Sequence, residues 1–267
     1  MRLLPDVELL ADLSWGVVDT VVLHVRSPSG EHIVKAAGPS NHHIAREITA
    51  HQTVTGVLAL RGVAARLTGF DRALNIVITE YLPGRLVDGG PDELSPDVHE
   101  QAGALLRLLH SQDQRIDSDH ERVATAKEIA SLDQPHRISP ALAGRARAIL
   151  AAYRFRPVTL VPTHGDWQPR NWLLDGRTIK VIDFGRFEYR PAYTDLGRLA
   201  TQQWQSAPDL EAAFLRGYGG DPREPEQWRA HLLRQAVSVA VWAHKVGDAE
   251  YEQQGLRMLD EAVALNA

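Results

Sequence analysis

The chain has 267 residues, of which 44% are hydrophobic, and its formal net charge is −5. This length and composition suit one large domain, or two lobes around a cleft, with a substantial hydrophobic core. The acidic balance argues against a nucleic-acid partner, because phosphate binding requires a basic face. The sequence contains no cysteine, which excludes disulfides, thiolate metal sites and cysteine nucleophiles.

The sequence also gives no sign of a membrane protein. No apolar run reaches the length of a membrane span, and Pro5 and Asp6 interrupt the first residues too early for a signal peptide. We therefore expect a cytoplasmic protein without a membrane partner, either a monomer or a homodimer.

The first third of the chain predicts a small β-sheet with one helix. Alternating residues over 21–26 indicate a strand, a turn follows at 27–30, and a second strand is expected over 32–36, with Lys35 on the same face as Ile33. The period then changes. Ile44, Glu47, Ile48 and His51 recur at helical spacing, which places Glu47 on the inward face, where a carboxylate requires a partner.

A further strand is expected over residues 75–79, and the Pro83-Gly84 pair that follows it marks a linker. We place the lobe boundary there: residues 1–79 form an N-terminal lobe, residues 80–84 the linker and residues 85–267 a C-terminal lobe. This predicts an α+β fold of two lobes, the first small and mainly β with one helix, the second larger and mainly helical.

The C-terminal lobe is expected to be helical apart from one hairpin. Ser95-Pro96 and Ser139-Pro140 each combine a capping hydroxyl with a proline in the first helical turn. The first of these pairs opens a helix whose buried stripe is predicted to contain Val98, Ala102, Leu105 and Leu109. Two strands, over residues 171–174 and 178–184, are joined by the turn Asp175-Gly176. From residue 195 to the end the pattern is helical.

The most informative stretch is His164-Gly165-Asp166-Trp167-Gln168-Pro169-Arg170-Asn171, followed after the hairpin by Ile182-Asp183-Phe184-Gly185. Phosphoryl transfer requires mainly position and neutralisation of charge. Asp166 can take or orient the proton of a hydroxyl, whereas Asn171 and Asp183 offer oxygen ligands to Mg²⁺. Each residue alone is typical of a turn or a cap, but the combination at this spacing predicts a kinase.

Lys35 and Glu47 extend this prediction into the first lobe. A strand lysine that points into the cleft would bind the α- and β-phosphates of a nucleotide, and an ion pair with Glu47 would hold it in place. The alternative is a solvated lysine and an exposed helix acid.

These motifs, together with Thr79-Glu80-Tyr81-Leu82-Pro83-Gly84, resemble the aminoglycoside phosphotransferase branch of the protein-kinase-like superfamily, over residues 14–215. The branch also includes choline, fructosamine and homoserine kinases. The resemblance implies a bilobal kinase fold that binds ATP or GTP with Mg²⁺, with adenine on the backbone of Glu80 and Leu82. It also implies that His164 and Asp195 support the catalytic loop.

Three departures from the protein-kinase pattern bear on function. Gly165 replaces an arginine that reads a phosphorylated activation loop, and the run from Asp183 to Asp195 is too short for such a loop or a peptide platform. Both indicate a constitutively active kinase of a small molecule. Residues 13–19 contain only one glycine, so Ser14 and Gly16 either cradle phosphate with backbone amides or belong to an ordinary strand connection.

The acceptor molecule is expected to bind between Asp166 and the C-terminal helices. Their acids would suit a polycationic aminoglycoside, but they alternate with arginines, so the charge largely cancels. Four tryptophans could contact the acceptor, although tryptophan in a helical lobe is more often core: Trp167, Trp172, Trp204 and Trp242. An uncharged or heterocyclic antibiotic is therefore an acceptor nearly as well supported as an aminoglycoside.

Our leading hypothesis is an ATP-dependent O-phosphotransferase that confers antibiotic resistance by phosphorylating one hydroxyl. A metabolite kinase of the choline, fructosamine or homoserine kinase type is the first alternative. A pseudokinase, which binds nucleotide without turnover, is an alternative of another class. The presence of Lys35, Asp166, Asn171 and Asp183 argues against it.

Overall fold

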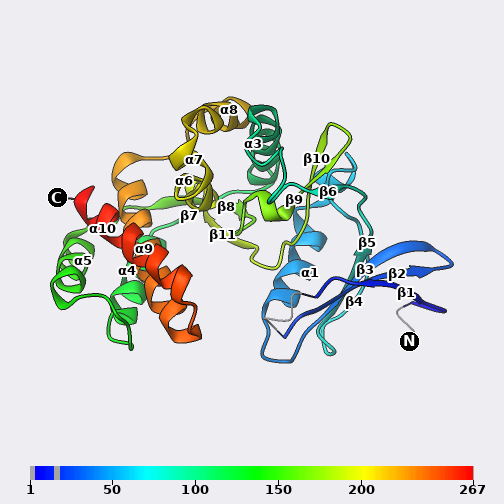
Figure 1. Ribbon diagram of the computed structural model, residues 1–267, viewed down its shortest axis with the longest axis horizontal. Coiled ribbons are helices and arrows are strands. Elements are labelled where there is room, and N and C mark those ends of the chain that lie inside the picture. Colours follow the sequence, from blue (N-terminus) through cyan, green and yellow to red (C-terminus); the bar gives the residue numbers. More distant parts are fainter. Residues whose placement is uncertain (1–3, 15–18, 267) are drawn as a thin grey trace. The chain divides into compact units, whose positions relative to one another are not determined.

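The computed structural model describes residues 4–14 and 19–266. Within them the N-terminal region is a β-sheet with a helix and the C-terminal region is mainly helical, so the predicted α+β class is confirmed (Figure 1). The strands are β1 (Glu8–Asp12), β2 (Val21–Ser27), β3 (Gly30–Ala36), β4 (Leu67–Asp71), β5 (Ile76–Glu80), β6 (Arg85–Leu86), β7 (Arg115–Asp117), β8 (Val158–Thr163), β9 (Trp172–Asp175), β10 (Thr178–Val181) and β11 (Glu188–Pro191).

The helices include two short 3₁₀ segments, η1 and η2, next to the motif residues. They are α1 (His43–Thr53), α2 (Gly56–Ala59), α3 (Pro96–His110), α4 (His120–Ser131), α5 (Pro140–Ala152), η1 (Pro169–Asn171), η2 (Ala192–Leu196), α6 (Gly197–Ala200), α7 (Gln203–Ser206), α8 (Pro208–Tyr218), α9 (Pro225–Val246) and α10 (Ala249–Ala264). Among the described residues, no helix is both long and apolar enough to cross a membrane.

The contacts divide the chain into two compact units. The first contains Met1–Gln114, Val161–Arg190 and Arg198–Asp221, and the second contains Arg115–Leu160, Pro191–Gly197 and Pro222–Ala267. The first unit thus combines the N-terminal sheet with both halves of the catalytic motif. Because this division does not fall at residues 80–84, the predicted lobe boundary there stays a prediction.

The first unit contains an antiparallel sheet of order β1-β2-β3-β5-β4 (Figure 1). In its centre Lys35 on β3 pairs with Val22 on β2 and with Val77 on β5. Helix α1 packs on this sheet, because Ile44 and Ile48 form a buried cluster with Val77. The helical spacing predicted for α1 is confirmed, and it fixes the face on which Glu47 lies.

A second sheet, of order β10-β9-β6, carries the motif hairpin. The predicted turn is confirmed, since Asp175 pairs with Thr178 and Gly176 has a φ of 59°. Both strands are shorter than predicted: Asn171 belongs to η1, and β10 ends at Val181. Asp183, with a φ of 66°, cannot continue an extended strand.

Helices α3 and α8 lie side by side in the first unit (Figure 1). Two glycines allow this approach, because a Cβ on Gly103 would overlap the backbone of α8 and one on Gly217 would overlap the backbone of α3. The predicted buried stripe of α3 is correct except at one position, where Leu106 is fully buried and Leu105 is not.

The second unit is built from α4, α5, α9 and α10, with an apolar core between them. It also holds a buried ion pair between α4 and α9, in which the Arg234 guanidinium donates to Glu121 at 2.8 Å and to the hydroxyl of Thr125 at 3.0 Å. The Tyr193 hydroxyl donates to the other Glu121 oxygen at 3.1 Å. These bonds compensate the Glu121 carboxylate for its complete burial.

His51 makes the stability of the first unit depend on pH. Its Nδ1 lies 3.1 Å from the Thr55 hydroxyl and its ring meets the edge of Phe184. Burial, aided by the positive charge of Lys35, lowers the pKa of His51 to about 4. In the unfolded chain the pKa of a histidine is about 6.5. Between these values only the unfolded chain binds the proton, so stability is lost as the pH falls from 6.5 towards 4.

We therefore expect His51→Gln to flatten the acid limb of the stability profile. From pH 7 to pH 5 the wild-type protein should lose roughly 2 kcal/mol through this residue, at about 1.4 kcal/mol per pH unit below the unfolded pKa. Urea unfolding of both proteins at pH 7 and pH 5 measures the difference. Equal losses in the two proteins would show that His51 does not carry the effect.

Candidate active site

Three predicted residues form one bridge in the first unit. The Lys35 Nζ donates to both carboxylate oxygens of Glu47, at 2.9 and 3.0 Å, and to Oδ1 of Asp183 at 3.0 Å. Lys35 comes from β3 and Glu47 from α1, while Asp183 lies two residues beyond β10. The register of the sheet and the helical period of α1 therefore bring together groups that are up to 148 residues apart.

The charges of this bridge fix its protonation state. Burial lowers the pKa of Lys35, but the carboxylates of Asp183 and Glu47 more than compensate and raise it above its usual value. The Lys35 ammonium holds the pKa of Asp183 well below its usual range. Burial raises the pKa of Glu47, and Lys35 opposes this rise. Lys35 and Asp183 are thus both charged at neutral pH.

Asp183 has a backbone conformation that side chains other than glycine rarely adopt. Its φ is 66°, which costs about 1–2 kcal/mol for a residue with a Cβ. The carboxylate accepts a long bond of 3.4 Å from the Gly185 amide and is half exposed. Such strain is typical of functional residues that the surrounding structure holds in place. Here it turns the carboxylate out of the β10 strand and toward Lys35.

His164 ties the two halves of the motif together. Its Nε2 lies 3.0 Å from the carbonyl oxygen of Ile182, and its Nδ1 accepts the Asp166 amide at 3.2 Å. One neutral tautomer, with the proton on Nε2, satisfies both bonds. The ring is fully buried and packs against Phe184. The support of the catalytic loop by His164 stays a prediction, for which these two bonds supply the contacts.

Asn171 lies next to Asp166 and to the strand that leads to Asp183. Its side-chain amide donates to the Asp166 carbonyl at 2.8 Å and to Asp166 Oδ2 at 3.2 Å. The Asn171 carbonyl accepts the Ile182 amide at 3.1 Å. Because both amide contacts use the nitrogen, the Asn171 side-chain oxygen is the atom suited to a metal ion.

The donor set suits Mg²⁺ bound together with a nucleotide. Among the described residues there is no group of three or more histidine and carboxylate side chains that could hold a metal ion. Mg²⁺ is commonly bound by one or two protein oxygens and completes its octahedron with phosphates and water. The Asn171 amide oxygen and the Asp183 carboxylate provide such a pair, so these residues fit the ion.

Asp166 is nearly enclosed, and its environment is more basic than the sequence analysis expected. Its side chain is 5% exposed. Burial alone would raise the pKa of Asp166, but three neighbouring arginines together lower it below its usual value. These residues are Arg186, Arg170 and Arg198. Sequence reasoning did not identify any of them as site residues, although Arg170 stands inside the motif and Arg186 directly after it.

The predicted adenine site is partly defined by backbone bonds. The Glu80 amide donates to the Arg66 carbonyl at 2.9 Å and the Tyr81 amide to the Glu31 carbonyl at 3.0 Å. The Glu80 carbonyl, and not its amide, is therefore the group that could contact a base. The contact of Leu82 with adenine stays a prediction.

The predicted phosphate loop can be followed only at Ser14. Its hydroxyl accepts the Val22 amide at 3.0 Å and its own amide donates to Asp12 at 2.9 Å. Ser14 thus closes the end of the β1–β2 pair, and both groups have protein partners there. Gly16 lies outside the described residues.

The comparison with known proteins assigns the chain to a family. The model of the family described as "Phosphotransferase enzyme family" matches residues 13–231. The chain belongs to this family. It is a small-molecule phosphotransferase, which confirms the enzyme class and the resemblance inferred from its motifs. A comparison with curated proteins finds no match.

Solved structures show the same fold as this phosphotransferase at low identity. A thermostable mutant of the aminoglycoside phosphotransferase APH(4)-Ia, in complex with ADP and hygromycin B, has a TM-score of 0.70 at 14% identity, over 98% of this chain and 95% of that chain. A macrolide 2'-phosphotransferase from Brachybacterium faecium has a TM-score of 0.58 at 18% identity, over 95% and 90%. A choline/ethanolamine kinase family protein from Mesorhizobium loti has a TM-score of 0.61 at 20% identity, over 97% and 87%.

Three of the four predicted substrate-binding tryptophans of the phosphotransferase are buried. Trp167 and Trp172 have no exposed surface and Trp204 is 4% exposed, so they offer no face to an acceptor. They pack instead, Trp167 and Trp172 edge to face and Trp204 against Phe214. Their burial corrects the expectation that these three tryptophans contact the acceptor.

Two other predicted residues of the phosphotransferase belong to the second unit. Trp242 on α9 is 52% exposed and meets Tyr251 edge to face. Asp195 is buried in η2. A substrate contact of Trp242 and the support of the catalytic loop by Asp195 both stay predictions.

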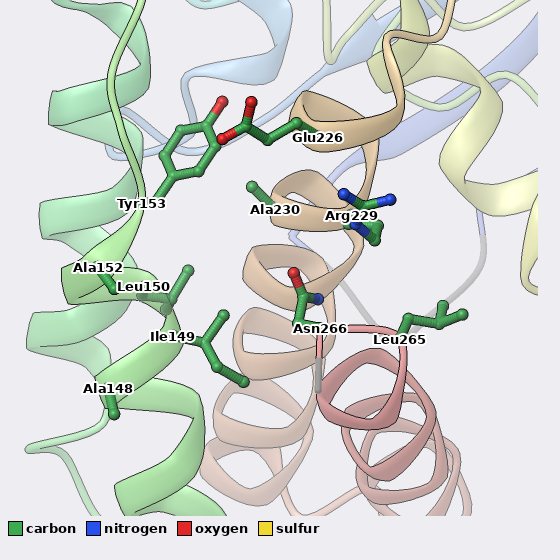
Figure 2. Close-up of a pocket in the computed structure, with 10 residues that line it drawn as sticks. All are labelled: Ala148, Ile149, Leu150, Ala152, Tyr153, Glu226, Arg229, Ala230, Leu265 and Asn266. Carbon is green, nitrogen blue, oxygen red and sulfur yellow. The ribbon is translucent and has the colours of Figure 1, made fainter.

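An open pocket of about 620 Å³ lies in the second unit of the phosphotransferase, between α5, α9 and the chain end after α10 (Figure 2). Tyr153 and Glu226 line one end, and Leu265 and Asn266 the other. None of the predicted site residues that the structure describes lines this pocket.

Proposed function

We propose that this protein transfers the γ-phosphoryl group of ATP or GTP to a hydroxyl of a small molecule, with Mg²⁺ as the metal ion. The observation that supports this most directly is the bridge from Lys35 to Glu47 and Asp183. The same arrangement of a strand lysine, a helix glutamate and a metal-binding aspartate operates in protein kinases.

Each residue of the site has one task in this reaction. Lys35, held by Glu47, contacts the phosphates of the nucleotide, while Asn171 and Asp183 hold Mg²⁺. The ion, when bound, neutralises charge on the phosphates. Asp166 orients the acceptor hydroxyl and takes its proton as the oxygen attacks the γ-phosphorus. His164 keeps Asp166 and the chain before Asp183 at a fixed separation.

We propose that the enzyme is constitutively active and acts in the cytoplasm. β11 begins at Glu188, five residues after Asp183. β11 and η2 together occupy residues 188–196, so the run from Asp183 to Asp195 is too short for an activation segment of the kind that protein kinases phosphorylate.

For the acceptor we propose an antibiotic, in which case the protein confers resistance. The fold likeness to an aminoglycoside phosphotransferase and a macrolide phosphotransferase supports this class. A metabolite is the second candidate, supported by a comparable likeness to a choline/ethanolamine kinase family protein. The four functional residues that would be dispensable in a pseudokinase are all present: Lys35, Asp166, Asn171 and Asp183.

An acceptor screen coupled to ADP release tests the proposal, with aminoglycoside, macrolide and nucleoside antibiotics, sugars and amino alcohols as acceptors. We expect acceptor-dependent ADP release that requires Mg²⁺. Resistance profiling of a sensitive host that expresses the protein separates antibiotics from metabolites. Binding of Mg-ATP without turnover of any acceptor would favour the pseudokinase instead.

A further inference from the structure

The carboxylate of Asp166 is crowded, because it accepts three side-chain hydrogen bonds and pairs with a further arginine. A carboxylate offers about four lone-pair positions to hydrogen-bond donors. Four side chains of the first unit already lie at its two oxygens: Gln168 at 2.6 Å and Arg198 at 3.4 Å from Oδ1, and Arg170 at 2.5 Å and Asn171 at 3.2 Å from Oδ2. A substrate hydroxyl that binds to Asp166 therefore competes with these donors.

The two arginines are the donors that can leave. Gln168 and Asn171 are buried, at 5% exposure each, whereas the side chains of Arg170 and Arg198 are 32% and 22% exposed. A charged arginine leaves a buried carboxylate most readily for another anion, because water does not replace the charge-assisted hydrogen bond that it loses.

The charge around Asp166 favours such an anion. Three arginines, including Arg186, act on this one carboxylate. Asp88 is a further acid near Arg170; burial and the charge of Glu93 raise its pKa, and the charge of Arg170 opposes this rise. Arginine binds planar oxyanions with two parallel hydrogen bonds, which makes it the preferred residue for carboxylates and phosphates.

We propose that the acceptor carries an oxyanion, a carboxylate or a phosphate, beside its reactive hydroxyl, and that this oxyanion draws Arg170 and Arg198 away from Asp166. The inference rests on the proposed phosphotransferase activity. Within the proposed class of antibiotic acceptors, a polycation such as an aminoglycoside fits poorly, because its ammonium groups would face the arginines; the inference therefore narrows that class to anionic acceptors. The acceptor itself thus frees the base that it requires.

The chemical step follows from this exchange. Once Arg170 turns to the oxyanion, the hydroxyl donates to the vacated Oδ2 of Asp166. The hydroxyl oxygen forms a bond to the γ-phosphorus as the bond from that phosphorus to the β–γ bridging oxygen breaks, and the electron pair leaves with ADP. The proton passes to Asp166 and then to solvent. No further reactant is needed.

Matched acceptors test the charge requirement through ADP release. D-ribose is compared with D-ribose 5-phosphate to test a phosphate, and D-glucose with D-gluconate to test a carboxylate. Hygromycin B serves as the polycationic acceptor. We expect kcat/KM to be at least about tenfold higher for the anionic member of a pair that is turned over. Faster turnover of the neutral member or of hygromycin B would overturn the inference.

Anion binding gives a readout that does not depend on turnover. Inorganic phosphate and acetate are titrated calorimetrically into the protein loaded with Mg²⁺ and AMP-PNP, at constant ionic strength. We expect one site for at least one of the two anions, weakened at least about tenfold in Arg170→Gln and independently in Arg198→Gln. The matched control is Arg122→Gln, because Arg122 is an exposed arginine on α4 that pairs with Asp119. Melting temperatures verify that the variants fold.

Two failures can be told apart in this experiment. If Mg-AMP-PNP binds but neither anion does, or if all three variants bind the anions like the wild type, the oxyanion inference is wrong while the proposed function stands. If neither Mg-AMP-PNP nor its guanine counterpart Mg-GMP-PNP binds, the proposed function fails, and the inference that rests on it fails too.

Discussion

Asp166→Ala is expected to lower kcat by on the order of 10² to 10⁴, the usual contribution of a positioned acid or base. Nucleotide affinity should remain close to that of the wild type, because Asp166 contacts the catalytic loop and its arginines and not the Lys35 bridge. Asp166→Asn keeps the size of the side chain but cannot take a proton, so it should lose turnover to a similar extent.

Asp183→Ala, in contrast to Asp166→Ala, should lower nucleotide affinity. Asp183 is the carboxylate proposed to hold Mg²⁺, and it also pairs with Lys35. Its removal should abolish the Mg-dependent part of nucleotide binding. Calorimetric titration of both variants with ATP, with and without Mg²⁺, makes the comparison, and ADP release gives the turnover. If the two variants had equal nucleotide affinities, the roles assigned to Asp166 and Asp183 would be wrong.

The parts of the site that depend on local periodicity could be predicted from the sequence. The strand alternation predicts the face on which the Lys35 side chain lies, and the helical spacing predicts the face of Glu47. The observed hydrogen bond of 2.9 Å joins these two side chains. The separation of Asn171 from Asp183 depends on one short hairpin with a clear turn signal. In each case a few neighbouring residues determine the geometry.

The basic surroundings of Asp166 could not be predicted in this way. Arg186 and Arg198 reach Asp166 from segments 20 and 32 residues further along the chain, and the strands and turns between them leave no local period that relates these positions. The strand β1 escaped prediction for a related reason. It lies at the sheet edge with little buried surface, so its residues do not alternate clearly between apolar and polar.

The burial of the tryptophans shows a different limit of prediction from the sequence. Tryptophan suits both a core and a ligand surface, and sequence spacing does not separate the two. The structure separates the two roles here, because Trp172 packs against His99 and Trp167 inside the protein. These tryptophans therefore support the catalytic loop from its buried side. The acceptor must therefore be recognised mainly by other groups, and the arginines at Asp166 are the candidates.

The sequence and the structure indicate different reasons for a glycine at position 165. In the sequence, glycine at this position shows that a phosphorylated activation loop has no arginine to receive it. In the structure, Gly165 has a φ of 82°, and a Cβ there would overlap the Arg186 carbonyl oxygen and lie 2.6 Å from the Arg190 guanidinium. The glycine thus lets the catalytic loop approach the segment that follows Asp183.

Gly165→Ala is therefore expected to impair both stability and catalysis, and the chain contains a matched control. Gly176 in the β9–β10 turn also has a positive φ, of 59°, but a Cβ there meets nothing within 4 Å. Both variants should lose about 1–2 kcal/mol to backbone strain. Only Gly165→Ala should lose roughly a further 1–3 kcal/mol of folding stability, the usual cost of overpacking.

The catalytic effect should separate the two glycine variants more widely than stability does. A displacement of about 1 Å at a reacting group can cost about 10² in rate. The overlap at Gly165 must move either Asp166 or the Arg186 segment, so kcat should fall by about that factor, whereas Gly176→Ala should retain nearly wild-type kcat. Urea unfolding and ADP release, measured on both variants, test this. Equal losses at the two positions would mean that backbone strain alone, and not the contact with Arg186, explains the glycine in the catalytic loop.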